Sequence, residues 1–86
     1  MGTDGHTASV FPQQIELWKE EKLCTVAKHP DSGQQRVTFT GHLINAASRV
    51  VFLVTGEEKA VIVKRIIQKT ENYTDYPASL VNPNYG

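Results

Sequence analysis

The sequence has little of what extracellular, nucleic-acid-binding or membrane proteins usually need. It contains one cysteine, Cys24, so no internal disulfide can form, which fits a reducing compartment. Nine lysine and arginine side chains are balanced by nine aspartate and glutamate side chains, which leaves no basic field for nucleic acid. The longest apolar run, residues 50–54, is too short to cross a bilayer. We therefore expect a soluble, cytoplasmic chain with no nucleic-acid or membrane partner.

Strand patterns are present in three places. Residues 23–27 and 36–40 are rich in β-branched and apolar side chains, which predicts a strand in each. Residues 49–55 contain five consecutive apolar residues, a pattern typical of a strand covered on both faces in a parallel sheet. This third segment is the clearest prediction from the sequence.

Helical patterns alternate with these strands. Residues 15–22 show a weak helical pattern, and residues 43–47 predict a short helix. Apolar side chains recur at three- and four-residue spacing over residues 60–69, which predicts an amphipathic helix. Glu57 and Glu58 would occupy its first turn, where negative charge suits the helix dipole.

The alternation of strands and helices predicts an α/β fold. We expect residues 1–86 to form part of a single domain with a partial Rossmann-like parallel sheet and flanking helices. Ligands of such folds bind beyond the carboxyl ends of the strands, and residues 55–59 would lie at one of those ends.

Residues 4–12 read D-G-H-T-A-S-V-F-P and are the first of four segments with a common resemblance. They closely resemble the D-G-H-T-A-S-L-F-P signature of one enzyme family, the 6-phosphogluconolactonases. Residues 36–40, R-V-T-F-T, are similar to its R-hydrophobic-T-hydrophobic-T strand, and residues 45–47 with residues 52–60 resemble its N-A-A and L-V-T-G-x-x-K-A segments. Residues 77–81 match a shorter fourth piece. These matches occur in the family's order and span nearly the whole chain.

The resemblance implies hydrolysis of 6-phosphoglucono-δ-lactone to 6-phosphogluconate, without a metal or another cofactor. His6 would act as the general base that activates water, since histidine exchanges protons near neutral pH. Asp4 would orient the imidazole or bind a sugar hydroxyl. Gly5 and Thr7 would contact the substrate, because backbone N–H groups of residues 5–9 can stabilise an oxyanion.

Two cations would hold the substrate phosphate. Arg36 would do so from a strand edge, and Lys59 from the first turn of a helix, where free backbone N–H groups attract anions. Taken alone, each has a simpler interpretation, a flanking residue for Arg36 and a solvated helix lysine for Lys59. Likewise, Asp-Gly-His alone is usually a surface turn, and His29 and His42 are interpreted as exposed bystanders.

Two other functions remain open. Glucosamine-6-phosphate deaminases share the fold and the D-G-H motif, but they continue with a sequence like I-A-F-N-E-P. Val10 and Phe11 stand in the stretch where those enzymes carry an acidic residue, which favours lactone hydrolysis. The third possibility is a noncatalytic sugar-phosphate-binding module.

The family's chains are much longer than this one. Their N-terminal half carries a Gly/Ser/Thr-rich phosphate loop and an acidic D-E-R-type segment, and neither occurs in these 86 residues. After residues 84–86 the family typically continues into one more strand. We therefore expect a C-terminal fragment whose unpaired strand edges and apolar faces promote self-association.

Overall fold

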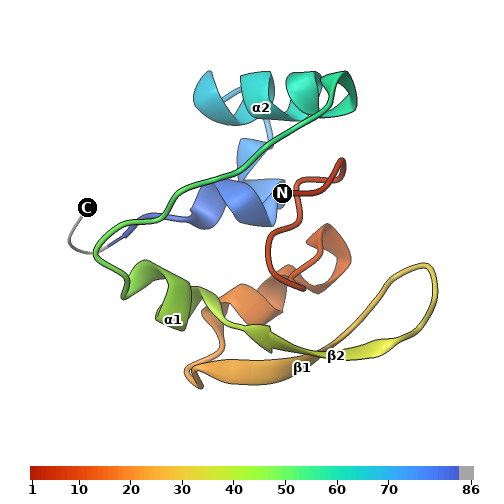
Figure 1. The fold of residues 1–86 in the computed structure, drawn as a ribbon, viewed down its shortest axis with the longest axis vertical. Coiled ribbons are helices and arrows are strands. Elements are labelled where there is room, and N and C mark those ends of the chain that lie inside the picture. The colour runs from red at the N-terminus through yellow and green to blue at the C-terminus, as the bar shows by residue number, and fades with distance from the viewer. Residues whose placement is uncertain (84–86) are drawn as a thin grey trace.

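The computed structural model describes residues 1–83, which fold into short helices and one two-stranded sheet (Figure 1). In chain order the elements are the 3₁₀ helix η1 (Pro12–Lys19), strands β1 (Cys24–Lys28) and β2 (Gln35–Phe39), helix α1 (Gly41–Asn45), the 3₁₀ helix η2 (Glu57–Lys59), helix α2 (Ala60–Ile67), and the 3₁₀ helices η3 (Tyr73–Asp75) and η4 (Pro77–Leu80). The hairpin of β1 and β2 lies at one end of the molecule and α2 at the other.

Strands β1 and β2 pair in antiparallel register, which confirms both predicted strands. Val26 lies opposite Val37, and Ala27 lies opposite Arg36. One face of the hairpin carries the buried side chains of Ala27 and Thr38, while Val26 and Val37 on the other face are 59% and 77% exposed. The hairpin therefore packs on the protein with one face and leaves an apolar face open.

Helix α1 begins where β2 ends, and Thr40 makes this junction. Its hydroxyl donates to the Lys22 carbonyl at 2.6 Å and accepts from the Leu43 amide as the N-cap of the helix. Gly41 lies against Trp18, and a Cβ at this position would come within 2.3 Å of the indole ring. The predicted short helix is confirmed, with a start two residues earlier than expected.

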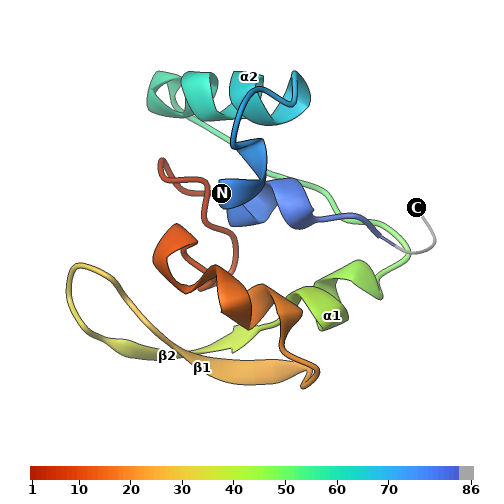
Figure 2. The ribbon, with the colours of Figure 1, turned by 180° about the vertical axis from the view of Figure 1, so that it is seen from behind.

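The core joins the two ends of the sequence. Its buried apolar side chains are Val10, Phe11, Trp18, Ala27 and Ala78. Figure 2 shows η4 beside the N-terminal loop, and the Ala78 amide donates to the Gly5 carbonyl at 2.9 Å. The side chain of Asn45 makes a second tie, since it donates to the Leu80 carbonyl at 3.3 Å and accepts from the Asn82 amide at 2.7 Å.

The strand predicted for residues 49–55 is wrong for this structure. The segment runs along one side of the molecule from α1 to α2 without joining a sheet (Figure 1). Val51 and Leu53 are 81% and 86% exposed. A strand needs a neighbour for its backbone N–H and C=O groups, and no strand among residues 1–83 lies beside this segment.

The predicted parallel sheet is also absent from residues 1–83. The structure is α/β in content, but its sheet is an antiparallel hairpin, so the described residues do not form the expected Rossmann-like arrangement. The predicted amphipathic helix of residues 60–69 is confirmed as α2. Residues 84–86, after which the family typically continues into a further strand, lie outside the described residues. Within residues 1–83, no helix has the length and apolarity needed to span a membrane.

Candidate functional site

The N-terminal loop that carries the Asp-Gly-His motif is a closed turn. The Gly5 amide donates to the Gly2 carbonyl at 3.0 Å, and the Gly2 amide donates to the His6 carbonyl at 2.9 Å. Gly5 has a φ of +81°, a left-handed conformation that glycine adopts without a steric penalty. The Asp-Gly turn signal therefore places the side chains of Asp4 and His6 on one short loop.

Asp4 and His6 contact each other directly. Oδ1 of Asp4 lies 2.6 Å from Nδ1 of His6 and also accepts from the His6 amide at 3.0 Å. When the hydrogen of a neutral imidazole sits on Nδ1 and faces the carboxylate, Nε2 keeps its lone pair and can accept a proton. The His6 side chain is 31% exposed, so the ring remains accessible to a ligand.

Two neighbours restrict the position of the His6 ring. A Cβ at residue 2 would lie 2.1 Å from Cε1 of His6, so only glycine lets the ring approach the backbone there. The ring also packs on the buried Phe11, with ring centroids 4.5 Å apart. The imidazole therefore lies against Gly2 and Phe11 and is held by the Asp4 carboxylate.

A cavity of about 430 Å³ opens beside this pair. Its lining residues come from the N-terminal loop, the start of η1 and the loop between β1 and β2: Thr3, Asp4, His6, Phe11, Gln13, His29, Pro30 and Asp31. The cavity thus adds His29, which the sequence interpretation took for a bystander. No sequence spacing connects His29 to His6, because tertiary contacts hold this loop beside the motif: the Lys28 amide donates to the Gln14 side chain, and Phe11 packs on His29.

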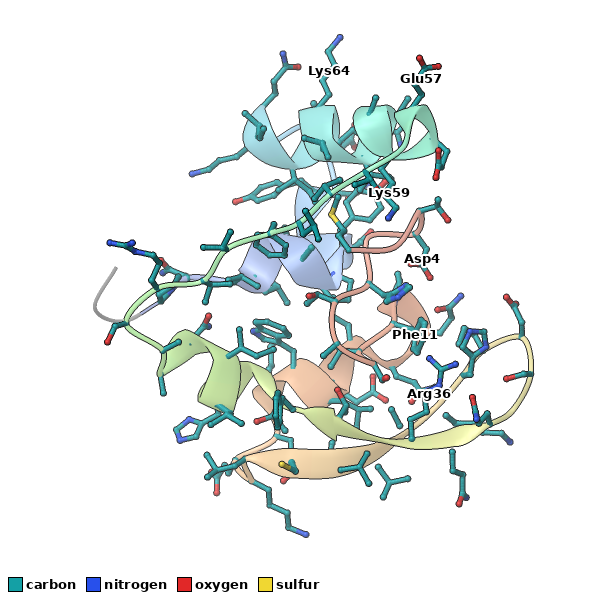
Figure 3. All side chains as sticks on the ribbon, viewed as in Figure 1. Asp4, Phe11, Arg36, Glu57, Lys59 and Lys64 are labelled. Carbon is teal, nitrogen blue, oxygen red and sulfur yellow. The ribbon has the colours of Figure 1, made fainter. Side chains whose placement is uncertain are left out.

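Arg36 and Lys59, the expected phosphate ligands, are not among the residues that line this cavity. Arg36 is exposed on β2, where its Nε donates to Oε1 of Gln34 at 3.0 Å. Lys59 is half-buried at the end of η2. Figure 3 shows Lys59 and Arg36 on the side of the molecule that carries Asp4, one above and one below it, whereas Lys64 points outward from α2.

Gly5 and Thr7 serve the loop through their backbones. Gly5 is buried and lies against Tyr76, while the Thr7 carbonyl accepts from the Val10 amide at 3.0 Å. Among residues 5–9, the amides of Gly5, His6 and Ser9 already donate within the loop or to the Thr38 hydroxyl. Thr7 forms an antiparallel bridge with Val10, in which the Thr7 amide pairs with the Val10 carbonyl. Of residues 5–9, this leaves Ala8 as the one whose amide has no acceptor within residues 1–83.

Ala8 marks the tightest point of this loop. Its φ of +50° is a left-handed conformation that costs a non-glycine residue about 1–2 kcal/mol. The hydrogen bond from the Ser9 amide to Oγ1 of the buried Thr38, 2.9 Å long, holds the chain just after it. As for metals, the described part of the chain groups no three His, Cys, Asp or Glu side chains around a possible ion site.

Comparison with known sequences identifies one family. The sequence model described as "Glucosamine-6-phosphate isomerases/6-phosphogluconolactonase" matches residues 1–86. The chain is 63% identical to the 6-phosphogluconolactonase of Treponema pallidum over 59 residues, which are 69% of this chain and 24% of that protein. All of this chain aligns with the 6-phosphogluconolactonase of Haemophilus influenzae at 46% identity, and the match covers 37% of that protein. All of it also aligns with the 6-phosphogluconolactonase of Homo sapiens at 42% identity, and that match covers 33% of the human protein.

Solved structures agree with this result. The crystal structure of a devB protein superposes with a TM-score of 0.88 at 42% identity, covering 99% of this chain and 35% of that one. The crystal structure of 6-phosphogluconolactonase from Thermotoga maritima superposes with a TM-score of 0.82 at 32% identity, covering 99% and 37%. These matches therefore cover between 24% and 37% of the length of these proteins.

Proposed function

Because the chain belongs to the glucosamine-6-phosphate isomerase/6-phosphogluconolactonase family, we propose that it is the His6-bearing part of a 6-phosphogluconolactonase. The complete protein would hydrolyse 6-phosphoglucono-δ-lactone to 6-phosphogluconate in the cytoplasm. The observation that carries the proposal is the 2.6 Å contact between Asp4 and His6 at the edge of a cavity. It supplies an oriented imidazole next to a space for substrate.

The chemistry needs one proton acceptor and one water molecule. Nε2 of His6 takes a proton from water while the oxygen of that water bonds to the lactone carbonyl carbon. The carbon–oxygen bond of the ring then breaks, and the ring oxygen takes the proton back from His6. Asp4 keeps the imidazole in the tautomer that can accept, since Nδ1 faces its carboxylate.

Negative charge develops on the carbonyl oxygen during this attack. The amide of Ala8 is the N–H group of residues 5–9 that is left to stabilise it, because the Thr7 amide is paired with Val10. The strained φ of Ala8 supports this role, because such conformations persist where function needs a fixed backbone. Gly5 contributes through the turn that presents this amide, and not through a free N–H group.

Arg36 and Lys59 would bind the phosphate from outside the cavity. A phosphate lies several bonds away from the lactone carbonyl, so its ligands need not line the space beside His6. In Figure 3 Lys59 lies above Asp4 and Arg36 below it, so the two cations would reach the ligand from opposite sides of the N-terminal loop. Charge-assisted hydrogen bonds from the two side chains would fix the orientation of the lactone.

The missing two thirds of the polypeptide would complete a parallel sheet. The five apolar residues of segment 50–54 suit a strand covered on both faces, and in the structure the segment has no neighbour. We place the other strands of the Rossmann-like sheet in the part of the protein outside this chain. The isolated chain would then self-associate through this surface and through the open apolar face of the hairpin.

The experiment assays the full-length protein that contains this chain on both substrates of the family. We expect hydrolysis of 6-phosphoglucono-δ-lactone above its spontaneous rate and no release of ammonia from glucosamine 6-phosphate. The buried Val10 and Phe11 support this preference, since they stand in the stretch where deaminases carry an acidic residue. Deamination would establish the alternative enzyme, and binding without turnover would establish a noncatalytic module.

A second measurement tests the role of His6. His6→Ala should lower kcat about 10²–10⁴-fold, the usual contribution of a general base. His42→Ala is the matched control, because His42 is exposed on α1 and lines a different hollow, beside Trp18. A His6→Ala enzyme as active as the His42→Ala enzyme would refute the assignment of the base.

A further inference from the structure

His29 occupies a fixed position at the start of the loop between β1 and β2. Its amide donates to the Gln34 carbonyl at 2.8 Å, and its carbonyl accepts from the Gly33 amide at 2.9 Å. Gly33 has a φ of +72°, which closes the loop. These bonds fix the backbone at His29, whose side chain lines the cavity.

The two ring nitrogens of His29 have different surroundings. Nδ1 accepts from the amides of Asp31 and Ser32, each at 3.2 Å. A nitrogen that accepts from N–H groups carries no hydrogen, so the neutral ring carries its hydrogen on Nε2. Within residues 1–83, Nε2 makes no hydrogen bond. The loop therefore prepares a donor that has no partner in the described protein.

The ring of His29 is also linked to the site of His6. It meets the buried Phe11 edge-on, with centroids 5.1 Å apart, and the same Phe11 packs on His6. Both histidines line the 430 Å³ cavity, together with Asp31 and Gln13. A ligand that occupies this space therefore lies next to both rings.

We infer that His29 is a second ligand-binding histidine of this site, whose Nε2–H donates to a hydroxyl oxygen of the bound sugar. A hydroxyl suits this part of the cavity better than a phosphate does. It can accept from His29 while donating to the carboxylate of Asp31, and that carboxylate would repel a phosphate. This inference rests on the proposed function and adds to it the group that recognises the sugar away from the lactone carbonyl.

Two substitutions separate this role from the structural roles of the same ring. His29→Asn keeps an acceptor for the loop amides, because asparagine bonds to backbone N–H groups two residues further on. His29→Phe keeps an aromatic edge against Phe11. Neither variant has the Nε2–H group, so in the full-length protein both should raise KM for the lactone about threefold to tenfold and leave kcat within about twofold.

The outcomes are distinct. A wild-type KM in His29→Asn would show that the ring only caps the loop, and a wild-type KM in His29→Phe would show that it only packs. Either result overturns the inference. If the unmodified protein does not hydrolyse the lactone, it is the proposed function that fails.

NMR of the unsubstituted protein tests the inference even if both variants fail to fold. Nitrogen-15 NMR of the histidine rings of the full-length protein should show His29 protonated on Nε2, and this signal should shift when 6-phosphogluconate is added. A hydrogen on Nδ1, or a signal unchanged at saturating 6-phosphogluconate, would overturn the inference.

Discussion

Residues 1–41 and residues 42–76 differ in how they use their apolar side chains. The first stretch contains buried residues from Gly5 to Gly41, whereas no residue in the second is buried. Yet the second stretch carries the longest apolar run of the sequence. Apolar composition alone therefore does not make a core, because a core also needs a second surface that faces the first.

The polar contacts of the two regions show the same contrast. In the first region, the side-chain amide of Gln14 bonds to both the amide and the carbonyl of Lys28, and the Ser9 amide donates to Thr38. Segment 50–54 has no strand beside it among the described residues. Most of the buried side chains thus lie in the first region, whereas segment 50–54 of the second leaves its apolar residues without a neighbouring strand.

Phe11→Ala should have the largest effect on this comparison. Phe11 is 1% exposed and contacts both His6 and His29, so removing its ring leaves a cavity in the core of the first region. We expect a loss of about 3–5 kcal/mol in the free energy of unfolding. Urea denaturation of the full-length protein measures this loss, and a change below 1 kcal/mol would show that residues 1–41 are less tightly packed than the structure indicates.

Leu53→Ala tests whether the second region is completed in the longer protein. Leu53 is 86% exposed here, so in the isolated chain the substitution should change the free energy of unfolding by less than about 0.5 kcal/mol. In the full-length protein it should cost about 2–5 kcal/mol, because the leucine would lie in a covered strand. Denaturant unfolding of both forms gives the two values, and equal effects would contradict the proposed parallel sheet.

Gly41→Ala affects the contact between α1 and η1. A methyl group would come within 2.3 Å of the Trp18 ring, which is 7% exposed and cannot move without disturbing the core. We expect a cost of about 1–3 kcal/mol. Gly33→Ala is the control, because a Cβ at residue 33 would meet only Cε of Lys28, at 3.5 Å. The φ of Gly33 is +72°, so the cost of this substitution is backbone strain alone. Tryptophan fluorescence should change in the first variant only.

Val37→Lys should have the smallest effect on folding and a clear one on association. Val37 is 77% exposed on the open face of the hairpin, so the free energy of unfolding should change by less than about 0.5 kcal/mol. A charge on this face should reduce self-association of the isolated chain. Light scattering after size-exclusion chromatography gives the molar masses of the unsubstituted chain and of the Val37→Lys variant. If the unsubstituted chain is already a monomer, the expectation of self-association is wrong.

Local sequence patterns were sufficient for the elements that need no distant partner. The strands near residues 23–27 and 36–40 and the helix of residues 60–69 are confirmed, because turn residues and helical periodicity act over short distances. The prediction of a strand at residues 49–55 was wrong for this structure, because its apolar run indicates burial between two layers and residues 1–83 do not supply those layers. The antiparallel pairing of β1 and β2 depends on register, which no single segment encodes.

The site was predictable to the same extent. The Asp-Gly-His motif placed Asp4 and His6 in one turn, and the structure gives them a direct contact. The spacing gave no sign that Gly2 must be a glycine for the ring of His6 to approach, or that His29 shares the cavity. Both facts arise from contacts between residues that the loop and the hairpin bring together only after folding.

The bond from the Ala78 amide to the Gly5 carbonyl has a consequence for synthesis on the ribosome. The Asp-Gly-His loop is translated at the start of this stretch, but the backbone group that anchors it comes more than seventy residues later. While the nascent chain is still growing, the loop lacks this anchor and the cover of Tyr76. The loop that carries the imidazole and its carboxylate therefore gains this tie to the rest of the fold only after η4 has been synthesised.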